Sequence, residues 1–409
     1  RVRPVRGGVK RPPVLAVADR RDLPLSFAQQ RLWFLDQLAG AGAYGIPVAA
    51  RLDGPLDRRV MAATIELLAQ RHESLRTVFT ARDGKPVQQI TPGDEIRLRF
   101  EDLSRLGTGD VAPAVAEAEM ERRLEAESRR PFDLEVGPLF RAQLYRITAT
   151  RHILALQMHH IISDGWSMEI LISELRQIYH AFAAGRPSPL EPPRLHYADY
   201  AVWQREVVAG EALQADLDYW TAQLDGARPL ELPTDRSAPK PRTSRGGVVE
   251  FEVDAATSAE LVGLGRSLGA TPFMTLLAAY QVLLARYTGS RDVVVATPVA
   301  NRGVAEVEKL VGFFVNTLAL RTRIDEDASF RDLLSQVRGV TLDAWAHQDL
   351  PFDRLMEALR PGRGAGALPF QQAVFTLGAP SLGDAAAAGG GAKGFGGLEL
   401  HPLPTSTRS

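Results

Sequence analysis

Hydrophobic and polar positions along this chain follow the helical period in some segments and the strand period in others. In the first half, apolar residues recur at three- and four-residue spacing in four segments, which predicts amphipathic helices. Alternating or continuous apolar runs between them predict strands. The expected helices are 27–38 (after Ser26 as N-cap), 60–72, 111–129 and 167–184, and the expected strands are 46–52, 87–100, 138–147 and 152–158.

A Pro-rich segment at 185–195 (GRPSPLEPPRL) predicts a boundary, because the second half again mixes helices and strands. The helices expected there are 197–209, 211–224, 257–268, 272–287 and 329–345, and the strands are 248–253, 292–297 and 315–323. Mixed elements in both halves indicate an α/β (α+β) architecture of two lobes. The predicted units are a linker at 1–22, an N-terminal lobe at 23–190 and a C-terminal lobe at 191–409, with a low-complexity flexible loop at 383–397.

Composition excludes several classes of protein. The 48 basic and 49 acidic side chains leave a net charge of −1, which argues against a nucleic-acid binder. The absence of cysteine excludes disulfides, thiolate metal sites and a cysteine nucleophile. No apolar run approaches the roughly 18 residues of a membrane span, so we expect a cytoplasmic protein without a membrane partner. The chain opens with Arg1, which indicates a piece cut from a longer polypeptide, with a processed protein as the alternative.

The string HHIISDG, residues 159–165, follows an apolar strand and is the strongest candidate for chemistry. A neutral imidazole accepts a proton or a hydrogen bond from an attacking amine or hydroxyl, and a strand end holds it rigidly. Of the two histidines, His159 is the one expected to be structural. Asp164 and Gly165 predict a tight turn in which the carboxylate binds the imidazole or pairs with a buried Arg. The string lacks a third ligand at zinc spacing, which argues against a metal site.

Missing motifs narrow the reaction further. The chain has no G-x-S-x-G serine elbow and no G-x-x-x-x-G-K phosphate loop, besides having no cysteine. A histidine without a protein nucleophile indicates direct transfer between two bound substrates, with no covalent enzyme intermediate.

These residues resemble the HHxxxDG signature of the condensation domains of non-ribosomal peptide synthetases, within the chloramphenicol-acetyltransferase-like superfamily. Five further segments resemble motifs of that family, in its order and spacing: LSFAQQRLWFLDQL at 25–38, RHESLRTVF at 71–79, YADYAVW at 197–203, VGFFVNTLALR at 311–321 and HQDLPFDRLME at 347–357. The resemblance implies two acetyltransferase-like lobes in a V-shaped pseudo-dimer with a central tunnel. It also implies attack by the amine of a carrier-bound aminoacyl acceptor on a carrier-bound acyl or peptidyl thioester.

The resemblance carries roles over to individual residues. His160 is the catalytic residue, as general base or as the group that positions the amine. Asp164 is a structural acid, paired with Arg71 or Arg76. The remaining expectations are that Gly165 keeps the tunnel wall open, that Ser167 contributes a hydroxyl to the site, that Asn316 faces the cleft, and that Trp33, Phe34, Trp203, Phe313 and Phe314 serve packing.

The implied partners are an upstream and a downstream peptidyl carrier domain and an adjacent adenylation domain. Phosphopantetheine belongs to the carrier domains, and no cofactor or metal is expected on this domain. The sequence departs from the family pattern at 360–367, and the family's last strands and helix are not found before Ser409.

Other readings within the superfamily stay open. The opening motif and HHIISDGWS are most similar to the subtype that takes a donor with an L-configured terminal residue. An epimerisation domain or a stand-alone acyltransferase is the second reading, although YADYAVW and HQDLPFDRL favour condensation. Heterocyclisation domains carry aspartates in place of the histidine pair, so His159 and His160 argue against that subtype. The third reading, from another class of function, is a non-catalytic module that recruits carrier domains or tailoring enzymes. Such relatives commonly lose the second His or the Gly, and this chain keeps both.

Overall fold

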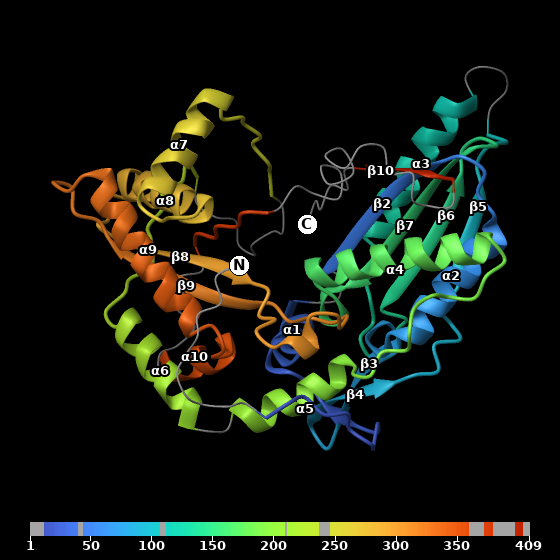
Figure 1. Cartoon of the computed structure of the whole chain (residues 1–409), viewed down its shortest axis with the longest axis horizontal. Coiled ribbons are helices and arrows are strands. Elements are labelled where there is room, and N and C mark those ends of the chain that lie inside the picture. The colour runs from blue at the N-terminus through green and yellow to red at the C-terminus, as the bar shows by residue number, and fades with distance from the viewer. Residues whose placement is uncertain are drawn as a thin grey trace.

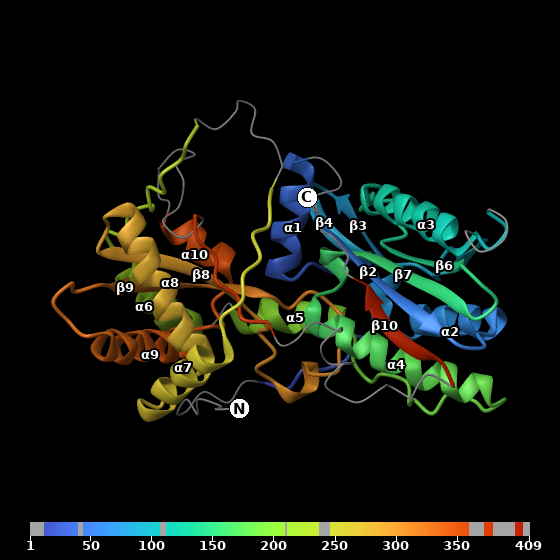
Figure 2. The same cartoon turned by 90° about the horizontal axis from the view of Figure 1, so that it is seen from above.

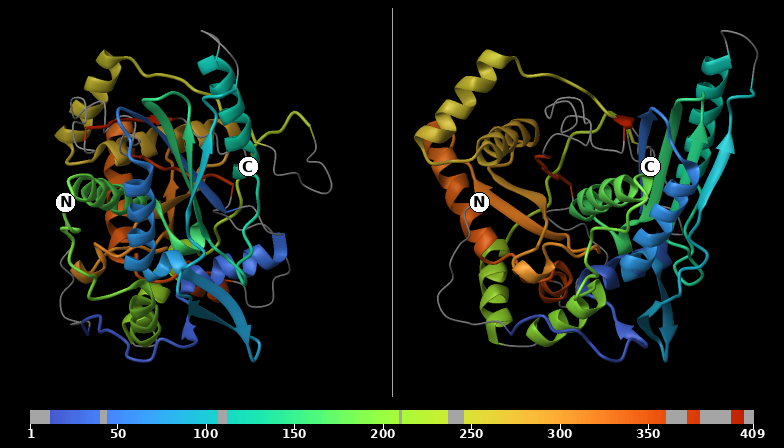
Figure 3. Two further views of the ribbon diagram at one scale, coloured as in Figure 1. Left: turned by 90° about the vertical axis from the view of Figure 1, so that its right-hand side faces the viewer. Right: turned by 45° about the vertical axis from the view of Figure 1, so that its right-hand side comes forward.

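The computed structural model describes residues 12–39, 44–106, 112–208, 211–236, 246–359, 372–378 and 397–403, and the remaining residues, including most of the expected loop at 383–397, lie outside this description. The described chain forms two lobes whose ribbons meet at helix α5 (Tyr197–Val208) and diverge on the opposite side (Figure 1). The right-hand view of Figure 3, from another direction, shows the same separation. This arrangement agrees with the two-lobed α/β fold predicted from the sequence.

The first lobe is built on a five-stranded sheet in the order β10-β2-β7-β6-β5, in which only β5 and β6 are parallel. A smaller sheet in the order β1-β4-β3 lies beside it. The strands of the two sheets are β1 (Leu23–Pro24), β2 (Gly45–Asp53), β3 (Thr77–Arg82), β4 (Lys85–Ile90), β5 (Leu98–Asp102), β6 (Phe140–Arg146), β7 (Arg151–His159) and β10 (Glu399–Leu403), and the lobe's helices are α1 (Phe27–Ala39), α2 (Arg58–Arg71), α3 (Ala112–Ser128) and α4 (Gly165–Ala183).

Helices cover both faces of the large sheet, with α3 on one face and α2 and α4 on the other (Figure 2). Alternation along β7 explains this, because successive side chains of a strand point to opposite faces. Ile153 and Ala155 pack in a cluster with Ala116 and Met120 of α3. Leu154 and Leu156 belong to the main core, together with residues of α2 and α4. The continuous apolar run of β7 is therefore the sequence mark of a strand buried on both faces.

Helix α4 begins at the turn that follows the histidine pair. Its N-cap is Asp164, whose Oδ1 accepts a hydrogen bond of 2.8 Å from the backbone N–H of Ser167. Such a cap satisfies one of the free N–H groups of the first turn. The helix then buries a stripe formed by Met168, Leu171, Leu175, Ile178 and Tyr179. The cap and the stripe together fix where β7 ends and where α4 starts.

The second lobe has a two-stranded antiparallel sheet of β8 (Asp292–Val299) and β9 (Asn316–Arg323). Val374 adds a parallel bridge beside Ala296. The helices of this lobe are α6 (Glu211–Leu224), α7 (Ala255–Ser267), α8 (Pro272–Thr288), α9 (Phe330–Ala346) and α10 (Phe352–Leu359). Helices α8 and α9 start at side-chain caps, Thr271 and Ser329, and pack with the β8–β9 hairpin in one core.

Two strand predictions differ from the structure. The expected strand 87–100 is interrupted between β4 and β5, where Gly93 adopts a left-handed conformation with φ of 81°. The expected strand 248–253 has no regular secondary structure, and no strand among the described residues pairs with it. Its side chains Val248, Val249 and Phe251 are 83–88 % exposed. A strand needs a hydrogen-bonded neighbour, so periodicity alone did not suffice there.

Two segments cross between the predicted units. Strand β10, from the part assigned to the second lobe, pairs antiparallel with β2 and covers an edge of the first lobe's sheet. Residues of the predicted linker pack against α5, since the carbonyl of Pro12 accepts a 2.7 Å hydrogen bond from Trp203 Nε1 and Val14 is buried. Arg20 binds Asp199 and Glu73.

Within the described residues, no single helix is long and apolar enough to cross a membrane; α7 and α8 pass such a test only as a pair bent by 107°.

Candidate active site at the junction of the two lobes

The histidine pair is held by the middle of the first lobe's sheet. Strand β7 lies between β2 and β6, and His159 is in register with Gly45 of β2. A short 3₁₀ turn, His160–Ile162, follows directly, and the His160 N–H donates to the carbonyl of Tyr44 at 2.8 Å. The imidazole of His160 is thus carried by a rigid backbone on both sides, as a group that must be aimed requires.

His159 is completely buried between the rings of Tyr44 and Phe132. Its Nδ1 accepts a hydrogen bond of 3.1 Å from the N–H of Ile161, which places the ring proton on Nε2. Burial, and then the neighbouring charge of His160, lower the pKa of His159 to about 3. A neutral ring that closes the turn beneath His160 supports the structural role expected for His159.

His160 is partly exposed and lies edge-on to Phe313 of the second lobe, with 5.7 Å between ring centroids. Its Nδ1 is 3.3 Å from the carbonyl oxygen of Ser163, which accepts only if Nδ1 carries the proton. In that tautomer Nε2 holds a lone pair, and it forms no hydrogen bond with a described residue. Burial lowers the pKa of His160, so the ring is neutral near pH 7. The site therefore presents an unprotonated imidazole nitrogen where the lobes meet.

Asp164 pairs with Arg302, which belongs to the loop after β8. Arg302 Nη2 is 3.2 Å from Asp164 Oδ1, and both side chains are 2 % exposed. The other carboxylate oxygen accepts a 3.0 Å hydrogen bond from the N–H of Phe314. The guanidinium also donates to the carbonyls of Val307 and Leu310 and stacks on the Phe314 ring at 4.0 Å. Asp164 thus binds a buried Arg, one of the two roles expected for it, and joins the lobes.

The expected pairing of Asp164 with Arg71 or Arg76 is wrong. Arg71 Nε binds Glu174 at 2.9 Å, and the same carboxylate contacts His72 Nε2 at 2.6 Å. Arg76 donates to the carbonyl of Thr91 at 2.6 Å. Both arginines therefore hold the first lobe together at other places. Nothing local in the sequence indicated Arg302, because it lies 138 residues from Asp164 along the chain.

The Ser167 hydroxyl, which the sequence predicted to contribute to the site, is hydrogen bonded to residues of the second lobe. Its Oγ donates to the carbonyl of Gly312 at 2.8 Å and accepts from the N–H of Gly312 at 3.0 Å and from Arg302 at 2.8 Å. Gly312 itself has no room for a side chain, since a Cβ there would be 1.8 Å from Cδ2 of Tyr197. The Tyr197 hydroxyl bonds to the carbonyl of Phe313 and, at 2.8 Å, to Ser26 Oγ. The sequence predicted these motifs individually but not that they converge.

Gly165 lies beside open space, whereas Asn316 is buried and hydrogen bonded. A Cβ on Gly165 would meet no atom within 4 Å, so this glycine leaves open space beside the histidine turn. The sequence predicted that Gly165 keeps a tunnel wall open, and this role stays a prediction. Asn316 is buried and binds the segment before α10: its amide donates to the carbonyls of Gln348 and Leu350 at 2.8 Å, and its Oδ1 accepts from the N–H of Phe352 at 3.1 Å. Asn316 therefore fixes that loop.

Most of the aromatic side chains assigned to packing are buried. Phe313, Phe314 and Trp203 are 5 %, 1 % and 8 % exposed. The two on α1 are less buried: Trp33 is partly exposed, and Phe34, which contacts its ring, is 49 % exposed. The apolar face of α1 is thus narrower than its sequence suggests.

Known proteins resemble this chain over nearly its full length. The Condensation domain family matches residues 19–384. A linear gramicidin synthase protein of Brevibacillus parabrevis is 46 % identical over 367 residues, 89 % of this chain and 5 % of that protein. Chondramide synthase of Chondromyces crocatus is 44 % identical over 356 residues, 87 % of this chain and 9 % of that protein. The chain therefore spans less than a tenth of these relatives.

A similar solved structure is the X-domain from teicoplanin biosynthesis. It is 27 % identical, with a TM-score of 0.81 over 97 % of this chain and 85 % of the X-domain, and it has also been solved in complex with OxyB. The fold, the intact HHIISDG turn and the matched residues agree with one another. The chain belongs to the condensation domain family.

Proposed function

We propose that this domain forms a peptide bond between two carrier-bound substrates. The amine of an aminoacyl acceptor attacks the carbonyl carbon of an acyl or peptidyl thioester donor, a C–N bond forms and the C–S bond breaks. The amine loses one proton, and the thiolate of the donor arm leaves and takes up one proton. The observation that carries the proposal is the free Nε2 of His160, held at the junction of the lobes by β7 and by the Asp164–Arg302 pair.

His160 acts on the attacking amine. Its Nε2 accepts a hydrogen bond from the amine N–H, which aims the nitrogen lone pair at the thioester carbon. Burial lowers the pKa of His160, which weakens it as a full proton acceptor. This favours the positioning role over general-base catalysis, the alternative considered from the sequence.

The proposed partners follow from the two thioester substrates, because each of them is attached to a carrier domain. An upstream and a downstream peptidyl carrier domain bring their phosphopantetheine arms to a tunnel between the lobes, next to an adenylation domain in a longer synthetase. The proposed donor ends in an L-configured residue. The lobe limits at 23–190 and 191–409 are part of the same proposal, except that β10 completes the sheet of the first lobe and that the part of the predicted linker 1–22 from Pro12 onward packs against α5.

A single-turnover assay tests the reaction, with donor and acceptor loaded on carrier proteins. We expect product from the parent and a rate about 10²–10⁴ times lower for His160→Ala. His180→Ala is the matched control, because His180 is an exposed residue near the end of α4. Equal rates for His160→Ala and the parent contradict a role for His160, and preference for a D-configured donor contradicts the subtype.

The second candidate is a module that recruits a carrier domain or a tailoring enzyme without catalysis. The similarity to the X-domain that was solved with OxyB favours it. The two functions separate in one experiment: a recruiting module binds loaded carrier protein but gives no product, and its binding is insensitive to His160→Ala.

A further inference from the structure

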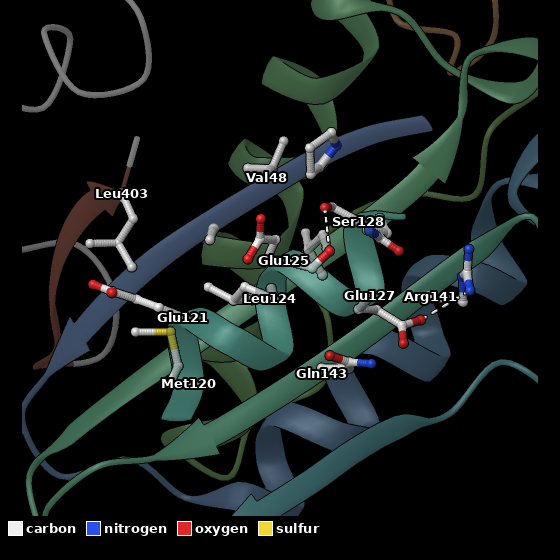
Figure 4. A pocket seen from close by; sticks show the side chains of 15 residues that line it. Val48, Met120, Glu121, Leu124, Glu125, Glu127, Ser128, Arg141, Gln143 and Leu403 are labelled. Carbon is white, nitrogen blue, oxygen red and sulfur yellow. Dashed lines mark hydrogen bonds and ion pairs between the residues drawn. The ribbon is translucent and has the colours of Figure 1, made fainter. Parts of the chain in front are cut away.

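A cavity of about 360 Å³ lies between α3 and the large sheet of the first lobe, and Figure 4 shows the side chains around it. Its size falls within the roughly 300–1,000 Å³ typical of small-molecule sites. None of its lining residues belongs to the HHIISDG turn. Strand β7 contributes Ala155, Leu156 and Gln157 to the lining. Ala155 packs in the cluster with α3, whereas Leu156 also belongs to the core on the other face of the sheet.

The walls of the cavity are apolar along much of its length. Ala49 of β2 and Ala155 of β7 form part of its floor, opposite Met120 and Leu124 of α3. Leu403 of β10 lies at the same end as Met120 (Figure 4). Small side chains on the strands thus leave a space that an aliphatic chain or a single ring would fill, and its burial there would be favourable.

Two buried polar atoms of the cavity lining lack a hydrogen-bond partner among the described residues, Oε1 of Gln157 and Nε of Arg141. Gln157 is 8 % exposed, and its Oε1 has no hydrogen-bond partner among the described residues. A buried carbonyl oxygen without a donor costs about 1–3 kcal/mol, which a ligand N–H would recover. The neighbouring amide, Gln143, is already engaged as the acceptor of a hydrogen bond from the Tyr145 hydroxyl. Gln157 is therefore the place where a ligand's donor group would bind.

The charge around the cavity is acidic. Three of its lining residues are glutamates, Glu121, Glu125 and Glu127, against one cation, Arg141. Arg141 and Glu127 form an ion pair at 3.0 Å, so the acidic excess of the lining rests on the carboxylates of Glu121 and Glu125. Arg141 also donates to the carbonyl of Arg130 at 2.7 Å and stacks on a ring. Glu125 forms an exposed pair with Arg129 at 2.7 Å, which is the weak kind of ion pair.

From these observations we infer that the cavity is a second binding site, for a small amphipathic amine with an aliphatic or aromatic body. The ammonium donates to Gln157 Oε1 and meets the acidic side of the cavity, and the apolar body lies between α3 and strands β2 and β7. The site is separate from the condensation reaction, so its occupancy does not depend on His160.

Calorimetric titration of the whole chain with n-octylamine tests the inference, with octanoate as the probe of opposite charge. We expect saturable 1:1 binding of octylamine, with octanoate at least about tenfold weaker. Gln157→Leu should weaken octylamine binding about tenfold, and Glu121→Gln about two- to threefold. Ala155→Leu should abolish it by filling the cavity.

Two controls keep the outcome decisive. Glu260→Gln, an exposed charge on α7, should leave octylamine affinity unchanged, and so should His160→Ala. Gln157→Leu should keep the condensation rate of the parent, which also shows that this variant is folded. Equal binding of octylamine and octanoate, or unchanged octylamine binding by Gln157→Leu and Ala155→Leu, would overturn the site without bearing on condensation.

Discussion

Arg302 and Asp164 form a buried ion pair between the two lobes, with 3.2 Å between Nη2 and Oδ1. Asp164 also caps α4, directly after the turn that carries His160. Asp164 therefore caps the helix after the histidine turn in one lobe and also binds the loop that carries Arg302 in the other. The position of His160 relative to the second lobe depends on this contact.

Breaking this pair should destabilise the protein strongly. Removal of one partner leaves the other charge buried, so Asp164→Ala is expected to lower the free energy of unfolding by about 3–5 kcal/mol. Urea denaturation measures this. Glu326→Ala is the matched control, because its pair with Arg291 is exposed, and it should cost about 0–1 kcal/mol. Similar losses in both variants would mean that Asp164 and Arg302 do not form a buried pair.

Gly312→Ala should be destabilising although it adds one methyl group. The new Cβ would lie 1.8 Å from the ring of Tyr197, which is itself fully buried and hydrogen bonded. Overpacking of this kind costs about 1–3 kcal/mol or more. Gly339→Ala in α9 is the control, since a Cβ there meets nothing within 4 Å and should stabilise the helix by about 0.5–1 kcal/mol. Thermal unfolding of both variants checks the contrast, and a neutral Gly312→Ala contradicts it.

Ser167→Ala separates a structural from a chemical role for this hydroxyl. Loss of its hydrogen bonds to Gly312 and Arg302 should cost about 1–3 kcal/mol of stability. We expect the pH profile of the condensation rate to keep its shape in this variant. Ser173→Ala, on the exposed side of α4, controls for the loss of a serine from this helix. A changed pH profile with unchanged stability would assign Ser167 to the chemistry instead.

His159 should make stability depend on pH. In the unfolded chain its pKa is 6.5, whereas in the folded chain the pKa is about 3. Between these values the unfolded chain binds the extra proton, so stability falls as the pH is lowered. From pH 7.5 to pH 5 this histidine should account for a loss of about 2 kcal/mol.

The comparison with His159→Asn isolates this contribution, because Asn keeps an acceptor near the position of Nδ1 but does not titrate. Its free energy of unfolding should fall about 2 kcal/mol less than that of the parent over the same pH range. His180→Asn, at an exposed histidine, should fall as the parent does. A parallel fall in parent and His159→Asn would mean that His159 is not held neutral.

The sequence by itself determined the elements and the reactive string. Apolar periodicity predicted the helices and strands that support the site, including the apolar strand that runs into His159. These are local properties, because side-chain direction repeats every 3.6 residues in a helix and every two in a strand. The turn after the histidines could also be predicted from the sequence, because Asp164 caps the helix that begins at the next residue.

Only the tertiary structure decided the long-range partners. Arg302, and not Arg71 or Arg76, lies beside Asp164, and β10 covers an edge strand far earlier in the chain. Several arginines were equivalent by sequence as partners for one carboxylate, and the choice among them depends on how the lobes pack. The segment 248–253 shows the same limit. Its residue pattern is typical of a strand, but no described strand pairs with it. The local pattern determines the direction of a side chain, and tertiary packing determines which residues it contacts.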